Sequence, residues 1–146
     1  MGDEGVGIHV VNHLYENYNL GEIDILDGGT GGFHLLEYFQ KYRQVLVVDA
    51  TIDGQPPGTI SFLKPKFSSD YPRTLTAHDI GLKDLIDSLF LLDVKTDIYL
   101  MTISIPQIEK VTLDISDQIR NAVPVAAEKI SQMVKSNLAE SFQNGW

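Results

Sequence analysis

The chain has 146 residues, of which 43% are hydrophobic, so it is long enough for one domain with a buried core and too short for two. Its formal net charge of -9 argues against nucleic-acid binding, which depends on clustered Lys and Arg side chains that contact phosphates. The absence of cysteine excludes disulfides, thiolate zinc sites and a cysteine nucleophile.

The first half of the chain alternates helical and strand patterns. Apolar residues at four-residue spacing from Val6 to Tyr18 predict a helix with one apolar stripe, and Gly21 ends it. A short strand, a glycine-rich loop and a second helix are then predicted over residues 23–26, 27–32 and 33–42. An unbroken aliphatic run next predicts a strand that is buried on both faces and ends at Asp49. This β-α-β order indicates parallel pairing.

The second half predicts a mixed sheet. The connection over residues 51–58 is shorter than a parallel crossover requires, so the strand over residues 59–64 should run antiparallel. A helix, a strand and a helical segment are then predicted over residues 82–89, 98–105 and 119–138. We expect Pro124 in the first turn of a new helix, where its missing N–H costs nothing. The predicted fold is therefore α/β, with a mixed, mostly parallel sheet.

Asp49 is the first candidate site residue. It stands at the carboxyl end of its predicted strand, and open α/β sheets bind ligands at that edge. The alternative is that its carboxylate caps the following turn.

Glu4 and His78 are the other candidates at predicted loop edges. Glu4 lies among glycines at the start of the first helix, although the helix dipole alone would favour a carboxylate there. His78 precedes the helix that contains Leu82, where an imidazole tends to stay neutral and can bind a metal; the alternative is an ordinary surface histidine. With Asp49, these residues would supply two oxygen ligands and one nitrogen ligand, which suits an open site for nickel, zinc or cobalt.

Several common sites are excluded by their spacing. His9 and His13 lie four residues apart, but a zinc-protease motif needs Glu where Val10 stands, so we expect a solvated helix edge. The glycine-rich loop lacks the Lys-Ser/Thr ending of a phosphate-binding loop, and His34 occupies the third small-residue position of a dinucleotide fingerprint. The chain also has no Gly-x-Ser-x-Gly nucleophile elbow.

Five short segments occur in the order seen in hydrogenase maturation proteases, and the chain resembles this family from Met1 to about Val125. These segments are Met1-Gly2-Asp3-Glu4-Gly5-Val6-Gly7, Asp27-Gly28-Gly29-Thr30, Val47-Val48-Asp49-Ala50, Pro56-Pro57-Gly58-Thr59 and His78-x-x-Gly81-Leu82. The resemblance implies that Glu4, Asp49 and His78 bind a metal, and that Asp27 is an acidic residue linked to catalysis. It also implies a three-layer α/β/α domain with a mixed sheet of about five strands.

The implied activity is that of an endopeptidase that removes the C-terminal extension of a nickel-iron hydrogenase large-subunit precursor after nickel insertion. The partner would be this precursor, and its nickel would be recognised in the substrate, although another divalent metal can substitute. Asp27 would act as general acid or base. Whether the same ion also polarises the scissile carbonyl or activates a water stays open, and Asp27 would have its role in either version. Two alternatives stay open: a non-catalytic, nickel-sensing hydrogenase-assembly binding protein, and a protease of similar fold with an unrelated substrate.

The chain departs from the family at its start. Family members open with a hydrophobic strand and a Gly-x-Gly-Asn loop, which this chain lacks, so we expect that the given sequence begins late. We expect residues 1–146 to form a single domain with frayed residues 143–146. Because no apolar run approaches the roughly 20 residues of a membrane-spanning helix, we expect a cytoplasmic protein without membrane insertion.

Overall fold

A computed structural model describes two helices and three strands, within residues 5–21, 23, 40–64, 91–92, 96–106 and 116–136. In chain order the elements are α1 (Val6–Asn17), β1 (Gln44–Thr51), β2 (Ile60–Leu63), β3 (Asp97–Ser104) and α4 (Asp117–Ser136). Each lies close to the element predicted from the sequence, because apolar spacing sets the helices and Gly or Pro ends the strands. Residues 40–41 are helical, Tyr42 is not, and residues 33–39 of the helix predicted over 33–42 lie outside the described residues.

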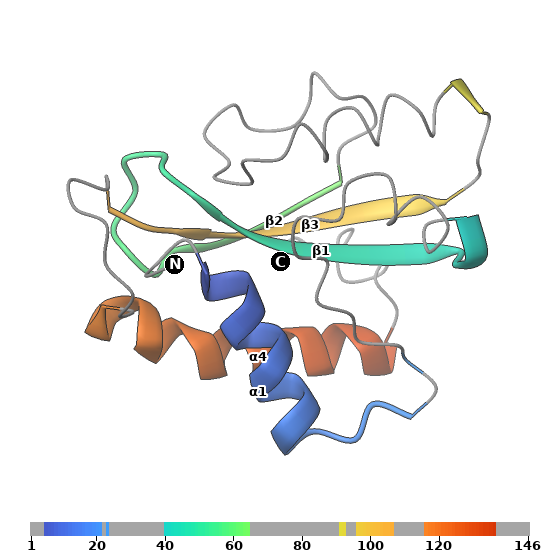
Figure 1. The fold of residues 1–146 in the computed structure, drawn as a ribbon, viewed down its shortest axis with the longest axis horizontal. Coiled ribbons are helices and arrows are strands. Elements are labelled where there is room, and N and C mark those ends of the chain that lie inside the picture. Colours follow the sequence, from blue (N-terminus) through green and yellow to red (C-terminus); the bar gives the residue numbers. More distant parts are fainter. Residues whose placement is uncertain are drawn as a thin grey trace.

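The three strands form one sheet in the order β1-β3-β2 (Figure 1). β1 pairs with β3 in parallel, from Gln44 opposite Asp97 to Thr51 opposite Ser104. β2 pairs with β3 antiparallel, as the short connection after β1 predicts for β2. The expectation of a mixed sheet in an α/β fold is therefore confirmed.

The most buried strand of the described sheet is β3, whereas the sequence favours β1. Every residue of β3 except Asp97 is buried, while β1 is half-buried until Ala50 and Thr51. The difference follows from strand order, because β3 has a hydrogen-bonded neighbour on each side. β1 also continues two residues beyond Asp49, to Thr51.

Both described helices lie on the same side of the sheet (Figure 1). The stripe predicted on α1 is confirmed, since Val6, Val10 and Leu14 are its buried residues. They share one core cluster with the buried side chains of α4 and of the central strand. Gly58, in the turn before β2, has φ of 93° and packs on the start of α4, where an added Cβ would lie 3.3 Å from the Gln118 carbonyl oxygen.

The prediction that Pro124 begins a new helix is wrong, because α4 begins at Asp117 and runs through this residue. A proline inside a helix costs about 3 kcal/mol, since it removes one hydrogen bond and crowds the preceding turn. Pro124 is exposed, so the carbonyl that loses its partner lies on the solvent side. Burial of the opposite side offsets the cost, and the side chains involved are Ile119, Ala122, Val123, Ala126, Ala127, Ile130 and Met133.

Several expectations fall outside the described residues. They are the strand at 23–26 apart from residue 23, the loop at 27–32, the helix at 82–89 and the frayed residues 143–146. Among the helices that the structure describes, none combines the length and the apolarity needed to cross a membrane.

Candidate functional site

The two faces of the sheet differ in what covers them. Alternate residues of each strand pack into the core with α1 and α4, among them Leu46, Val48 and Ala50 of β1 and Tyr99, Met101 and Ile103 of β3. Because side chains alternate along a strand, the residues between them point to the opposite face. Asp49 is one of these, so its side chain lies on the sheet face away from the two helices.

This opposite face changes from apolar to polar along the strands. Its amino-end half is apolar and consists of Val45 and Val47 of β1 and Ile98 and Leu100 of β3. Its carboxyl-end half carries hydroxyls and one carboxylate, and we call this set the polar cluster: Asp49, Thr51, Ser61, Thr102 and Ser104. The strand register brings these residues together, because Asp49 pairs with Thr102, Thr51 pairs with Ser104 and Ser61 pairs with Thr102.

Most of the polar cluster is buried. Thr51, Thr102 and Ser104 expose 2%, 3% and 0% of their surface, and Asp49 is half-buried. Ser104 Oγ has no hydrogen-bond partner among the residues that the structure describes. Burying a hydroxyl without a partner costs about 1–3 kcal/mol, so the Ser104 hydroxyl is unfavourable for stability alone.

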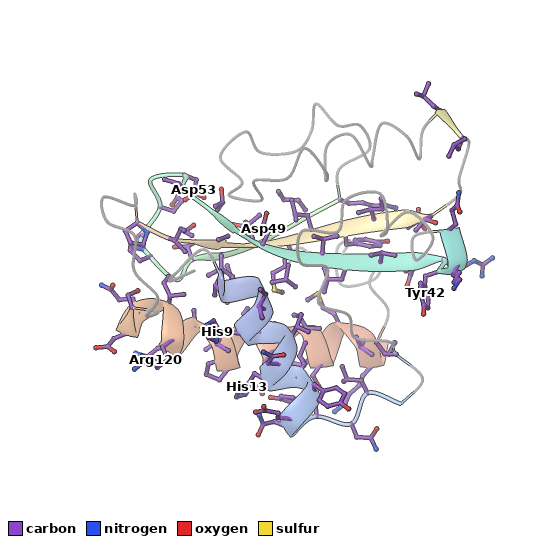
Figure 2. The ribbon with its side chains drawn as sticks, in the orientation of Figure 1. His9, His13, Tyr42, Asp49, Asp53 and Arg120 are labelled. Atoms are coloured by element: carbon purple, nitrogen blue, oxygen red, sulfur yellow. The ribbon has the colours of Figure 1, made fainter. Side chains whose placement is uncertain are left out.

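Asp49 makes a hydrogen bond within its own strand. Its Oδ1 accepts a 2.8 Å hydrogen bond from the backbone N–H of Ala50, which still belongs to β1. Asp53 caps the turn that follows the strand, since its Oδ1 accepts a 3.1 Å hydrogen bond from the N–H of Gln55. Figure 2 shows Asp53 in the loop and Asp49 within the strand. The site interpretation of Asp49 stays a prediction.

The start of α1 lies against the carboxyl end of β1. A Cβ built on Gly7 would be 2.5 Å from the Val48 carbonyl oxygen and 3.9 Å from the Asp49 Cα. Gly5 is the N-cap of α1 and makes no side-chain cap. The start of α1 at Gly5 and Gly7 therefore lies beside the strand end that carries Asp49.

Of the predicted site residues, the structure describes Asp49, whereas Glu4, Asp27 and His78 lie outside the described residues. Their convergence around a metal stays a prediction. Within the described ranges, no three His, Cys, Asp or Glu side chains form a possible metal site.

The histidine pair on α1 fits the expected helix edge. His9 is exposed, and the ring of His13 lies 6.4 Å from the ring of Tyr18, centroid to centroid. Figure 2 draws both histidines on α1, away from Asp49. The sequence interpretation missed the hydroxyls of the polar cluster and the contact of Gly7. The Thr102-x-Ser104 alternation before Pro106 was the available signal, because it repeats the pattern of Asp49-x-Thr51 at another strand end.

A family model described as hydrogenase maturation protease matches residues 8–133. The chain belongs to the hydrogenase maturation protease family. A relative from Rhizobium leguminosarum, the hydrogenase expression/formation protein HupD, is 30% identical over 59% of this chain and 44% of that protein. The hydrogenase 2 maturation protease of Escherichia coli is 29% identical over 61% of this chain and 56% of its own length. The chain thus spans about half the length of these relatives.

Solved structures of this family share the fold. The hydrogenase-maturating endopeptidase HybD from Escherichia coli aligns with a TM-score of 0.80 and 23% identity, over 94% of this chain and 87% of that one. A hydrogenase 2 maturation peptidase from a Thaumarchaeota archaeon aligns with a TM-score of 0.68 and 26% identity, over 94% of this chain and 92% of that one. These likenesses support the α/β class of the whole chain.

Proposed function

We propose that this protein is an endopeptidase that removes the C-terminal extension of a nickel-iron hydrogenase large-subunit precursor after nickel has been inserted. Family membership supports the class of reaction. The observation that carries the proposal is the position of Asp49, at the carboxyl end of β1 within a buried polar cluster and beside the start of α1. Open α/β sheets bind ligands at the carboxyl ends of their strands, so a role in binding explains a carboxylate at this place.

Nickel enters this proposal as part of the substrate. Glu4, Asp49 and His78 together offer two carboxylates and one imidazole, a donor set that suits Ni²⁺ and also Zn²⁺ or Co²⁺. Asp49 accepts one hydrogen bond from the Ala50 N–H, and a carboxylate has about four lone-pair sites, so this bond is compatible with a metal contact. Coordination by these residues would favour the nickel-loaded precursor over an empty one, which prevents premature cleavage.

Cleavage of the peptide bond requires proton transfers. A water must lose a proton as it attacks the scissile carbonyl, and the departing amine must gain one. Asp27, in the glycine-rich loop, is the residue that we assign to this general acid-base role. When bound, the metal would supply positive charge near the reacting carbonyl.

The test compares nickel-loaded with nickel-free precursor, with the mass of the large subunit as the readout. The protein should shorten the loaded precursor and leave the empty one intact. Glu4→Ala, Asp49→Ala and His78→Ala should each slow this cleavage, and Asp27→Asn should abolish it. Asp53→Ala is the matched control, since this aspartate follows the same strand but caps a turn. Full activity in all the site variants would contradict the assignment, and tight binding without cleavage would favour an assembly-binding protein.

A further inference from the structure

His9 and His13 lie about one turn apart on α1, the helix over Val6–Asn17. Side chains four residues apart on a helix project from the same face, with about 5–6 Å between their Cβ atoms. Figure 2 shows both histidines on this helix, away from Asp49. The pair is therefore a group of metal-ligating side chains that the proposed cleavage does not use.

Both imidazoles are accessible and have no competing bond within the described residues. His9 is exposed and His13 is half-buried, and neither ring has a hydrogen bond or an ion pair with another described residue. The Asn17 side chain donates its 3.0 Å hydrogen bond to the backbone carbonyl of His13, not to the ring. The ring of His13 lies near that of Tyr18, and a ring contact of this kind does not use the nitrogen lone pair of an imidazole.

The backbone that carries the pair is held in place by the core. Val10 and Leu14 directly follow the two histidines, and both are buried against the rest of the core cluster. The Tyr18 N–H donates a 3.0 Å hydrogen bond to the Leu14 carbonyl oxygen, which closes the last turn of α1. The spacing of the two imidazoles is therefore set before an ion binds, and binding has to order only their side chains.

Two histidines at this spacing supply two ligands of a metal site. In zinc proteases the same pair binds the ion, and the glutamate between them acts as general base, so Val10 removes the base and not the ligands. Imidazole nitrogen suits Zn²⁺, Cu²⁺ and Ni²⁺. Among the described residues no third His, Cys, Asp or Glu side chain completes the group, which leaves the other positions to water. Glu16, three residues after His13 on the same side of α1, adds a negative charge that favours a cation nearby.

We propose that His9 and His13 bind one divalent cation of the Zn²⁺, Cu²⁺ or Ni²⁺ class, through one ring nitrogen each. This site is separate from Asp49, because Asp49 lies on the sheet face away from α1. It goes beyond the proposed function and takes no part in cleavage. One consequence is that nickel bound by the isolated protein is not by itself evidence for binding at Asp49.

The test titrates the whole, metal-free chain with Zn²⁺ and with Ni²⁺ and measures binding by isothermal titration calorimetry. An Asp49→Ala background removes the other proposed site, and one equivalent of metal should still bind. In this background His9→Gln and His13→Gln should each weaken binding by at least about 10-fold, because loss of a group that only supports a metal ligand already costs about 10–100-fold. Unchanged binding in both variants would overturn the proposal.

A matched control keeps two histidines on α1 and changes their spacing. Val11→His combined with His13→Val preserves the composition but places the histidines two residues apart, where helical side chains do not face each other. Its affinity should fall as far as that of the single variants. An affinity equal to that of the original pair would also overturn the proposal, since independent imidazoles would then explain the binding.

Nuclear magnetic resonance identifies the ligands directly and does not depend on the folding of Asp49→Ala. Zn²⁺ is diamagnetic, so the ring signals of His9 and His13 stay visible and should shift together when Zn²⁺ is added to the wild-type protein. Ring signals that both stay unchanged would contradict the proposed site.

The outcomes also separate this inference from the proposed function. His9→Gln and His13→Gln should cleave nickel-loaded precursor at the wild-type rate, and loss of cleavage in either folded variant would contradict the separation of the two sites. Failure of the wild-type protein to cleave the precursor would reject the proposed function alone, because the Zn²⁺ titration would still decide whether the histidine pair binds metal.

Discussion

One face of the sheet contains two regions of opposite chemistry on the same pair of strands. At the amino end, Val47 pairs with Leu100, and two strand positions later Asp49 pairs with Thr102. Both regions are covered: Leu100 exposes 0% of its surface and Thr102 exposes 3%. Burial therefore does not explain the difference. The amino-end half contributes apolar surface to stability, whereas the carboxyl-end half replaces that surface with hydroxyls and a carboxylate.

The largest effect should come from the carboxylate that begins the polar half. Asp49→Asn keeps the size of the side chain and an acceptor for the Ala50 amide but removes the charge. Loss of a residue that only hydrogen-bonds to a metal ligand costs roughly 10–100-fold in activity. Because Asp49 is proposed as a ligand itself, the cleavage rate of nickel-loaded precursor should fall by more than this. Rates are measured by mass spectrometry. The control variant Asp53→Asn should cleave at the wild-type rate. A wild-type rate for Asp49→Asn as well would mean that the polar half of this sheet face has no more part in cleavage than the apolar half.

A core substitution in the apolar half should act on stability instead. Leu100→Ala leaves a cavity and should lower the free energy of unfolding by about 2–5 kcal/mol, measured by urea denaturation. The remaining folded protein should cleave the precursor at the wild-type rate. A selective loss of rate without loss of stability would show that the functional region extends into the apolar half.

Hydroxyls at the two ends of β3 should respond differently to removal. Thr96 Oγ1, next to the amino end, donates a 3.0 Å hydrogen bond to the Tyr42 carbonyl oxygen. Thr96→Val should therefore cost about 1 kcal/mol of unfolding free energy, measured by urea denaturation, and leave cleavage unchanged. A gain in stability would contradict this interpretation of the hydrogen bond.

The smallest effect on stability, and one of opposite sign, should come from removing the hydroxyl at the carboxyl end of β3. Ser104 Oγ is buried without a partner among the described residues, so Ser104→Ala should leave the free energy of unfolding unchanged or raise it by up to about 1 kcal/mol. Thermal and urea unfolding measure the change, with Ser131→Ala on α4 as a second buried serine for comparison. A loss equal to that of Thr96→Val would mean that the Ser104 hydroxyl stabilises the fold.

Local sequence patterns predicted the described helices and strands well. They could not predict which residues of distant strands pair with one another. The spacing of Val6, Val10 and Leu14 predicts α1 because a helix repeats every 3.6 residues. Asp49 was placed near the carboxyl end of its strand because an aliphatic run leads into it, but the strand continues to Thr51. Thr102 was missed because its neighbourhood exists only once β3 pairs with β1 in this register.

The prediction that Pro124 lies in the first turn of a new helix was wrong for a related reason. Helix interiors disfavour proline locally, but the apolar side of α4 is buried along its whole length and overrides that preference. The close approach of Gly7 also depends on two distant segments meeting, so a glycine in the sequence does not reveal it.

The order β1-β3-β2 has a consequence for synthesis on the ribosome. The central strand of the described sheet is the last of the three to be translated, so β1 and β2 emerge before the strand that joins them. Until residues 97–104 leave the exit tunnel, the nascent chain carries strand edges that other chains can pair with, and pairing of distant segments is slow. Pairing of this sheet therefore waits for the emergence of β3, and chaperone binding to the growing chain should protect it from aggregation until then.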